Sequence, residues 1–176
     1  MVAYASVVTT SVEVAATAKR GEKVALLARL LRAVPPQDVP VVIGLLVGEP
    51  RQGRLGVGWA TVAASRVVPA ASSTVTVGEV DSLFSSLAAE SGEGSQGRRE
   101  AALAALMARL TDVEQQHLVR VIGGEVRQGA NEGVVADAVA KAAGVSGPAL
   151  RRAAMLLGDL GMAAARALAG QSLDVG

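Results

Sequence analysis

The chain has 176 residues and a formal net charge of +1, and 51 % of its residues are hydrophobic. This length suits one domain, and the apolar content excludes an intrinsically disordered chain. Because the net charge is so small, binding to nucleic acid would depend on where positive side chains are placed rather than on overall charge.

Cysteine is absent, and His117 is the one histidine. The composition excludes disulfides, thiolate metal sites and cysteine nucleophiles, and it argues against a histidine-based metal site. No apolar run approaches the ~18 residues of a membrane span, and the N-terminus lacks the pattern of a signal peptide. We therefore expect a cytoplasmic protein with no metal site and no membrane partner.

Apolar residues recur at helical spacing through most of the chain, which predicts an all-α, multi-helix domain. Residues 1–15 are the exception, because their β-branched side chains predict a strand-like or loosely helical lead-in. The double proline at 35–36 ends the first regular helix, and Asp38 is placed to cap the next one. In chain order the helices are expected at about 15–33, 39–47, 59–62, 79–90, 98–110, 112–123, 131–143, 147–159 and 162–169.

The sequence contains an internal repeat. Residues 48–53, Gly-Glu-Pro-Arg-Gln-Gly, align without gaps with residues 124–129, Gly-Glu-Val-Arg-Gln-Gly, when the sequence is shifted by 76 positions. The preceding helices also match in apolar pattern, so two copies of a helical unit are expected to pack as a pseudo-symmetric pair. We place the halves at about 15–68 and 79–170, with a linker at about 69–78, inside a single domain spanning 1–176.

Both repeated loops have the chemistry of an anion site. Each offers a fixed positive charge, an amide side chain and glycines that let a ligand approach the backbone, and each precedes a helix N-terminus. A plain helix-ending turn is the alternative, but a turn needs the glycines and not a repeated Arg and Gln. Because no row of base-reading side chains is present, we expect sequence-independent contacts with backbone phosphates. The expected contacts are Arg51, Gly53, Arg54, Arg127, Gln128 and Gly129.

A third candidate loop, residues 92–97, carries the pattern G-x-G-x-x-G and opens a predicted helix. A dinucleotide site would need a strand before it, and a P-loop would need Gly-Lys-Ser/Thr, so we exclude both. Two arginines in a first helical turn oppose the helix dipole, and a nearby phosphate would offset that cost. Ser95, Arg98 and Arg99 are therefore added to the expected DNA contacts, with a solvated charged turn as the alternative.

No catalytic set is apparent in the sequence. His117 lies on a predicted helix without an evident Ser and Asp pair, and we interpret it as an ordinary helix histidine. Trp59 follows a glycine-rich stretch, and we expect it to serve in core or loop packing rather than as a platform on which bases stack.

Three segments together resemble the N-terminal domain of ATP-dependent DNA ligases. They are residues 42–49 running into 55–58, residues 91–96, and residues 117–129 with the apolar positions that follow. The third is the most specific, because that family typically shows Leu-x-Arg-Leu-Ile-x-Gly-x-Leu-Arg-x-Gly there. Gly-Asp-Leu at 158–160 is similar to an element near the end of that domain. The likeness covers about residues 15–170, in an actinobacterial style of composition.

The resemblance implies an all-helical fold of two pseudo-symmetric halves that holds nicked duplex DNA through its minor groove, in DNA repair, recombination or replication. The family's adenylation and OB-fold domains would follow in the parent chain, and its nucleophile is the Lys of Lys-x-Asp-Gly. That motif is absent here, so we expect a non-catalytic, monomeric, nucleoid-associated domain without a cofactor of its own. ATP and Mg²⁺ are expected for the parent enzyme.

Two positions depart from the family pattern, because Gln128 and Glu93 stand where an apolar residue and a lysine are common. We expect these two departures to affect the affinity for DNA rather than the family resemblance. A helical protein–protein interaction module is the alternative function, and it predicts an exposed apolar groove instead of an arginine-lined surface. A free-standing enzyme would need a catalytic set that the residues do not provide.

Overall fold

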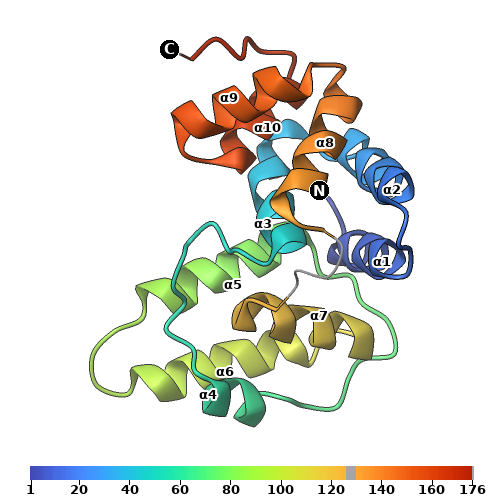
Figure 1. The fold of residues 1–176 in the computed structure, drawn as a ribbon. Coiled ribbons are helices and arrows are strands. Elements are labelled where there is room, and N and C mark those ends of the chain that lie inside the picture. Colours follow the sequence, from blue (N-terminus) through green and yellow to red (C-terminus); the bar gives the residue numbers. More distant parts are fainter. Residues whose placement is uncertain (126–129, 176) are drawn as a thin grey trace.

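The computed structural model describes residues 1–125 and 130–175, and helices dominate both stretches (Figure 1). The predicted all-α fold is confirmed. A short 3-10 helix, Pro36–Asp38, precedes α3. The α-helices are α1 (Tyr4–Ala15), α2 (Arg20–Arg32), α3 (Val39–Val47), α4 (Trp59–Ala64), α5 (Val77–Ala89), α6 (Ser95–Met107), α7 (Asp112–Gly123), α8 (Glu132–Ala143), α9 (Gly147–Leu157) and α10 (Leu160–Leu168).

The lead-in of the chain is a regular helix, so the strand-like alternative for residues 1–15 is wrong. The side chains of Val7, Val8 and Val14 are buried in the core. Burial of this face outweighs the low helix propensity of β-branched residues. A single antiparallel bridge between Ala3 and Thr76 is the extended structure that remains in this part of the chain.

Helix starts depend on capping groups that the sequence only partly revealed. Asp38 precedes α3, but its side chain makes no capping hydrogen bond, so that expectation is wrong. The 3-10 turn and a proline in the first turn of α3 take its place. Capping boxes instead start α5, through Thr76 and Glu79, and α7, through Thr111 and Glu114.

The internal repeat extends over four helices. With the shift of 76 positions, α1, α2, α3 and α4 fall on α5, α6, α7 and α8. The third helices of the two repeats have their C-caps at matching positions, Gly48 and Gly124. Helices α9 and α10 follow the second repeat and have no counterpart in the first.

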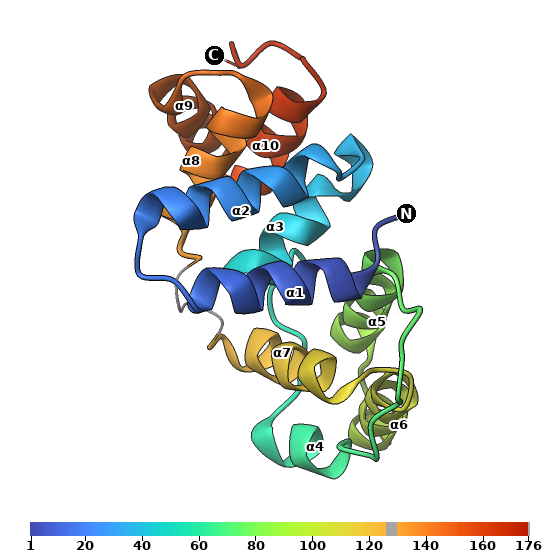
Figure 2. The same cartoon turned by 90° about the vertical axis from the view of Figure 1, so that its right-hand side faces the viewer.

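The two repeats are interleaved rather than stacked. Helix α4 packs on α6 while α8 packs on α2, and α1 contacts α7 while α3 contacts α5. In Figure 1 and Figure 2, α4 to α7 lie at one end of the molecule and α2, α3 and α8 to α10 at the other, with α1 between them. Each repeat therefore covers the second helix of the other with its own fourth helix.

This exchange is repeated in single polar pairs. Arg20 of α2 donates to Asp137 of α8 at 2.6 Å. Gln96 of α6 lies 76 residues after Arg20, and Thr61 of α4 lies 76 residues before Asp137. At these equivalent positions the Thr61 hydroxyl donates to Gln96 Oε1 at 3.2 Å. A pseudo-two-fold relationship thus holds for side chains as well as for helices.

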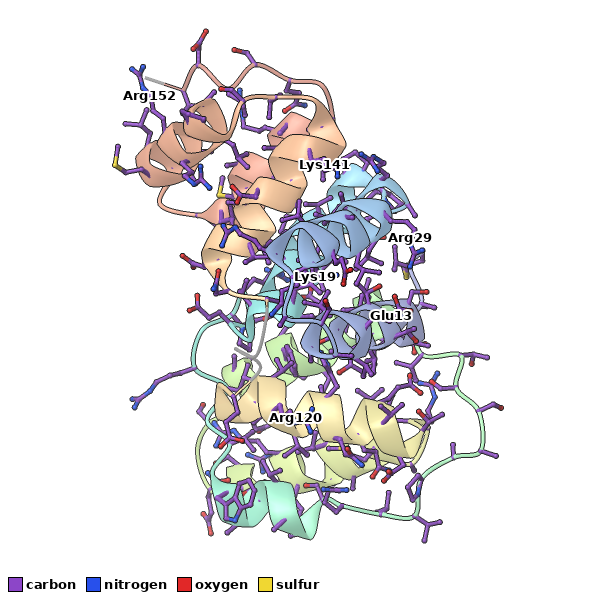
Figure 3. All side chains as sticks on the ribbon, turned by 45° about the vertical axis from the view of Figure 1, so that its right-hand side comes forward. Glu13, Lys19, Arg29, Arg120, Lys141 and Arg152 are labelled. Atoms are coloured by element: carbon purple, nitrogen blue, oxygen red, sulfur yellow. The ribbon has the colours of Figure 1, made fainter. Side chains whose placement is uncertain are left out.

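The core beneath these pairs is almost wholly aliphatic. Tyr4 and Phe84 are its two aromatic residues. Charged side chains spread over the outside: Figure 3 shows Glu13 of α1 and Arg29 of α2 on one face, where their carboxylate and guanidinium lie 3.2 Å apart. No helix in the described residues has the length and apolar character needed to cross a membrane.

Candidate nucleic-acid interface

The carboxyl ends of α3 and α7 converge on one hollow of about 760 Å³. Its lining comes from residues 48–50 and 53–58 after α3 and from residues 121–124 at the end of α7. Glycines supply much of this surface, and a Cβ atom added at Gly53, Gly58 or Gly124 would meet nothing within 4 Å. A ligand in the hollow can therefore approach the backbone of both repeats closely.

The two helix ends at the hollow have the same geometry. Gly48 (φ 76°, ψ 26°) and Gly124 (φ 71°, ψ 24°) are both left-handed. The amide of Glu49 donates to the carbonyl of Gly44 at 2.9 Å, and that of Glu125 donates to Arg120 at 2.8 Å. The Gly-Glu that starts each repeated motif is thus a helix-ending turn that satisfies a terminal carbonyl. The Arg and Gln of the motif are left for another role.

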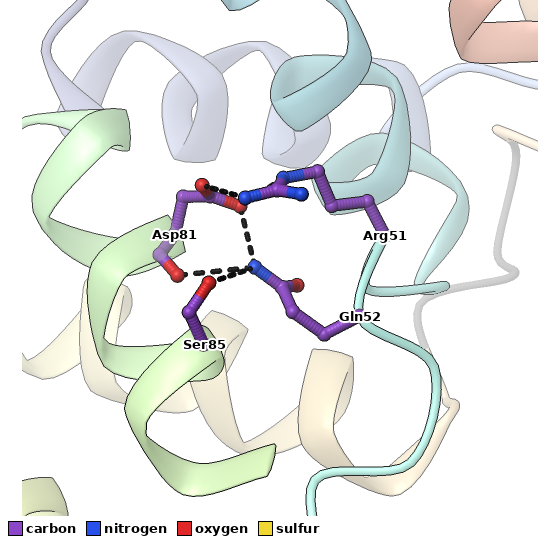
Figure 4. Close-up of polar contacts among 4 residues, drawn as sticks. All are labelled: Arg51, Gln52, Asp81 and Ser85. Atoms are coloured by element: carbon purple, nitrogen blue, oxygen red, sulfur yellow. Dashed lines mark hydrogen bonds and ion pairs between the residues drawn. The ribbon is translucent and has the colours of Figure 1, made fainter. Parts of the chain in front are cut away.

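In the first loop, that role is to bind α5 (Figure 4). The Arg51 guanidinium donates to both carboxylate oxygens of Asp81. Gln52 Nε2 donates to the same carboxylate at 2.7 Å, to the carbonyl oxygen of Asp81 at 3.1 Å and to the Ser85 hydroxyl at 3.0 Å. The hydrogen bonds that Arg51 donates to the Asp81 carboxylate raise the pKa of Arg51 above its ordinary value. The loop is therefore tied to the first helix of the second repeat.

Arg54 and Gly53 occupy the rim of the hollow. Both are exposed and line it. Gly53 has φ +74°, a conformation that favours glycine. Arg54 makes no ion pair or hydrogen bond with any residue that the structure describes. Among the predicted arginine contacts within residues 1–125 and 130–175, Arg54 is the one that lines the hollow.

The arginines at the start of α6 have internal partners. Arg98 forms an ion pair with Glu90 at 2.5 Å and donates to the carbonyl oxygens of Glu93 and Ser91 at 2.9 and 3.1 Å. This pairing offsets the unfavourable position of a cation in a first helical turn. It supports the charged-turn alternative for this loop. Ser95, the first residue of α6, is partly exposed in the same turn.

Arg99 links this turn to the hollow. Its guanidinium donates to the carbonyl oxygens of Leu87 at 3.1 Å and of Glu90, so it caps the end of α5. It also lies against Gly56 of the hollow, where an added Cβ would stand 2.8 Å from the guanidinium carbon. Arg99 therefore packs against the glycine-rich segment that follows the first loop and links it to the end of α5. The remaining predicted contacts, Arg127, Gln128 and Gly129, lie outside the residues that the structure describes.

Sequence reasoning missed the partners that organise this region. Asp81 and Ser85 lie 30 and 33 residues from the arginine and the amide that they bind, and nothing in local spacing indicates such pairs. Glu90 lies 8 residues before Arg98, at the other end of the same loop. Gln96 was also missed: its amide donates to the carbonyl of Gly56 at 3.5 Å, which fixes the glycine-rich segment to α6. The alignment of Gln96 with Arg20 of the other repeat is the sequence feature that could have indicated this role.

Trp59 does not pack in the core, so that expectation is wrong. Its side chain is 74 % exposed, whereas Val135, the equivalent residue of the second repeat, is fully buried. Helix α4 has 6 residues and α8 has 12, so α4 buries less of its surface. Trp59 directly follows Gly58 on the wall of the hollow.

His117 lies in the core rather than in a reactive cluster. Its Nδ1 is 2.6 Å from the hydroxyl of Tyr4, and the side chain is 4 % exposed. Burial lowers the pKa of His117 to about 4, and the charge of Arg120 adds to the shift. The same burial raises the pKa of Tyr4, with a contribution from Glu114. The pair is therefore neutral at physiological pH, as expected of a structural histidine.

The sequence is similar to parts of known proteins. Residues 59–140 match the family described as DNA ligase N terminus. A probable DNA ligase of Mycolicibacterium paratuberculosis is 49 % identical over 168 residues, which cover 94 % of this chain and 32 % of that protein. DNA ligase B of Mycobacterium tuberculosis is 47 % identical over 167 residues, covering 94 % and 33 %. A probable DNA ligase of Saccharopolyspora erythraea is 47 % identical over 176 residues, covering 100 % and 34 %.

The chain spans about a third of the length of the curated relatives that it matches. The match nevertheless runs through nearly all of the chain, including both repeats and α9 and α10. Together with the all-helical repeat fold, this makes the chain similar, through nearly its whole length, to part of these DNA ligases, and residues 59–140 carry the match to the family described as DNA ligase N terminus.

Proposed function

We propose that this chain binds nicked duplex DNA without sequence preference, as the non-catalytic domain of an ATP-dependent DNA ligase that acts in repair, recombination or replication. The observation that carries the proposal is the convergence of the two repeated helix ends on one glycine-lined hollow, with Arg54 exposed on its rim. A backbone without Cβ atoms admits a sugar–phosphate strand, and the arginine supplies the charge that phosphates attract.

Symmetry supports a duplex as the ligand. The sugar–phosphate strands of a duplex run antiparallel, so they are related by local two-fold axes. A protein surface with a pseudo-two-fold axis can offer equivalent groups to both strands, as symmetric DNA-binding dimers do. In this chain the reciprocal packing of α4 on α6 and α8 on α2 creates such an axis within one polypeptide.

The paired arginines have a supporting part in this proposal. Arg51 uses Nε and Nη2 on Asp81, and a guanidinium has further N–H donors on Nη1. With its side chain 48 % exposed, Arg51 can reach a phosphate with these donors, while the Asp81 carboxylate offsets part of its charge. Arg98 and Arg99 fix the neighbouring turn, to which the partly exposed Ser95 belongs. Arg127, Gln128 and Gly129 complete the proposed contact set from the second loop.

The catalytic steps belong to the proposed parent enzyme. Its adenylation and OB-fold domains would use ATP and Mg²⁺, and this domain would supply affinity and orientation for the nick. The proposed role here is therefore binding and positioning, with no covalent step on residues of this domain.

A competition experiment tests the function. Labelled nicked duplex is bound to the purified chain at low salt and displaced by unlabelled nicked duplex, by intact duplex of the same sequence, or by single strands. The proposal predicts that both duplexes compete whatever their sequence, that the nicked one competes at least as well as the intact one, and that single strands compete poorly. Equal competition by single strands, or strong dependence on sequence, would contradict it.

A helical protein-interaction module is the second candidate. Three exposed apolar side chains on the packed helices α9 and α10 favour it: Met155 at 75 %, Leu156 at 50 % and Met162 at 50 %. They belong to the part of the chain outside the repeat. Failure of every DNA competitor, together with loss of a protein partner on Met155→Lys, would establish this candidate over DNA binding.

A further inference from the structure

Trp59 is the tryptophan of a chain that has one tryptophan, one tyrosine and one phenylalanine. The tyrosine and the phenylalanine are buried, whereas the tryptophan is 74 % exposed. An aromatic ring of this size dominates the energetics of surfaces where it becomes buried. Because the other two aromatic residues are in the core, the exposure of Trp59 suggests that a ligand covers its ring.

The equivalent position in the other repeat is apolar and fully buried. Val135 is a buried residue inside α8, the helix that packs on α2, while Trp59 begins the much shorter α4. Three residues further along each helix, Val62 in α4 and Ala138 in α8 are both buried. Helix α4 therefore docks on α6 through its second turn and leaves the first residue facing outward.

The segment that carries Trp59 is held firmly. Gln96 of α6 binds the carbonyl of Gly56 and accepts a hydrogen bond from Thr61, which bracket Trp59 on both sides. Arg99 backs Gly56 from beneath. Little ordering of the backbone is then needed when a ligand covers the ring, and this preorganisation favours binding.

Trp59 also stands beside the proposed phosphate grip. It follows Gly58, which lines the hollow, and Arg54 lies earlier in the same segment. Resting on the proposed function, we infer that Trp59 lays its indole against the deoxyribose and base surface of the bound duplex. This contact adds an apolar contribution to the binding free energy, which the arginines do not provide.

This contact has a signature distinct from a phosphate contact. A phosphate contact releases counterions, so its loss lowers the slope of log K against log salt. An apolar stacking contact releases none, so its loss weakens binding equally at every salt concentration. Truncating an aromatic side chain that stacks on an unpaired base of a single strand weakens binding by roughly 5- to 100-fold, and we expect a smaller loss, toward the lower end, for a contact with duplex sugar and base surface.

The test uses the purified chain, nicked duplex and two readouts. Trp59 is the sole tryptophan, so its emission reports this position directly. The inference predicts quenching of that emission along the same isotherm that the anisotropy of labelled DNA follows. It predicts a weaker Trp59→Ala complex with an unchanged salt slope, and partial recovery in Trp59→Phe. Met155→Ala, which removes an equally exposed apolar side chain from α9, is the matched control and should bind like the wild type.

The possible outcomes distinguish a failure of this inference from a failure of the proposed DNA-binding function. Circular dichroism and the melting temperature show whether Trp59→Ala keeps its fold, which its exposure predicts. DNA binding with unchanged tryptophan emission and an unaffected Trp59→Ala variant would overturn the inference and leave the proposed function standing. A reduced salt slope in Trp59→Ala would also overturn it, because the residue would then be acting through the phosphate contacts. No binding by the wild type would overturn both.

Discussion

The Arg51 guanidinium binds the Asp81 carboxylate at two points, with Nε 2.8 Å from Oδ1 and Nη2 2.7 Å from Oδ2. Arg51 follows the third helix of the first repeat and Asp81 lies on the first helix of the second, so the ion pair joins the repeats beside the hollow. Such two-point pairs are the strong form of the interaction. Asp81 therefore competes with any phosphate for the same side chain.

Replacing Asp81 by Asn tests that competition. The change removes a negative charge and releases Arg51, so we expect DNA affinity to rise several-fold and the salt slope to steepen by roughly one unit. Binding is measured by anisotropy over a salt series. Asp174→Asn, which makes the same charge change in the exposed C-terminal segment, is the control and should have little effect. Weaker binding by Asp81→Asn would mean that the ion pair holds the loop in its binding form.

A pair of glycine substitutions tests the helix end at the hollow. A Cβ at Gly44 would stand 2.6 Å from the carbonyl oxygen of Glu49, whereas one at Gly21 of α2 would meet nothing within 4 Å. We expect Gly44→Ala to lower the free energy of unfolding by about 1–3 kcal/mol, because backbone atoms must shift. Gly21→Ala should raise it by about 0.5–1 kcal/mol through helix propensity. Urea denaturation measures both, and equal effects would refute the close approach.

The Tyr4–His117 pair predicts how stability depends on pH. The folded pKa of His117 is about 4, below its ordinary value of 6.5, because burial disfavours the charged ring. Above pH 6.5 neither state gains a proton there, so the full stability is present. As the pH falls from that value toward the folded pKa, the unfolded chain binds a proton that the folded chain does not, and stability is lost.

We expect a loss of about 2 kcal/mol between pH 7.5 and pH 5 from this residue. His117→Gln should be less stable at neutral pH, because it loses the bond to Tyr4, but its stability should change much less over that interval. Urea denaturation of both proteins at the two pH values gives the comparison. Parallel pH dependence in the two proteins would show that another group is responsible.

Periodicity and the repeat predicted most of this fold. The apolar spacing of α2 and of α5 to α10 located those helices, because their buried faces follow the helical period. It failed at α1, where Val7 and Val8 are poor helix formers that the core nevertheless buries. The alignment of residues 48–53 with 124–129 revealed two units but not their interleaving, since the packing of α8 on α2 is a tertiary contact between distant segments.

The candidate site was predicted in part. The spacing indicated that Arg51, Arg98 and Arg99 belong to loops near helix ends, and the structure places them there. The partner of Arg51 could not be predicted, because Asp81 lies 30 residues away and is brought to Arg51 by the packing of α5 rather than by local sequence. Glu90 is only 8 residues from Arg98, but the sequence does not show how the loop between them folds. Trp59 was predicted to be packed on the strength of its type, and the shortness of α4 exposes it instead.

The most direct test of the central claim is the salt dependence of binding to nicked duplex, compared between the wild type and Arg54→Ala. Fluorescence anisotropy across a salt series gives log K against log salt. The account predicts a wild-type slope of roughly −2 to −3, as expected for the arginines left available to phosphates (Arg54, Arg127 and in part Arg51), and a slope shallower by roughly one unit in Arg54→Ala. No wild-type binding even at ~50 mM salt, or identical slopes for the two proteins, would contradict a phosphate grip at this hollow.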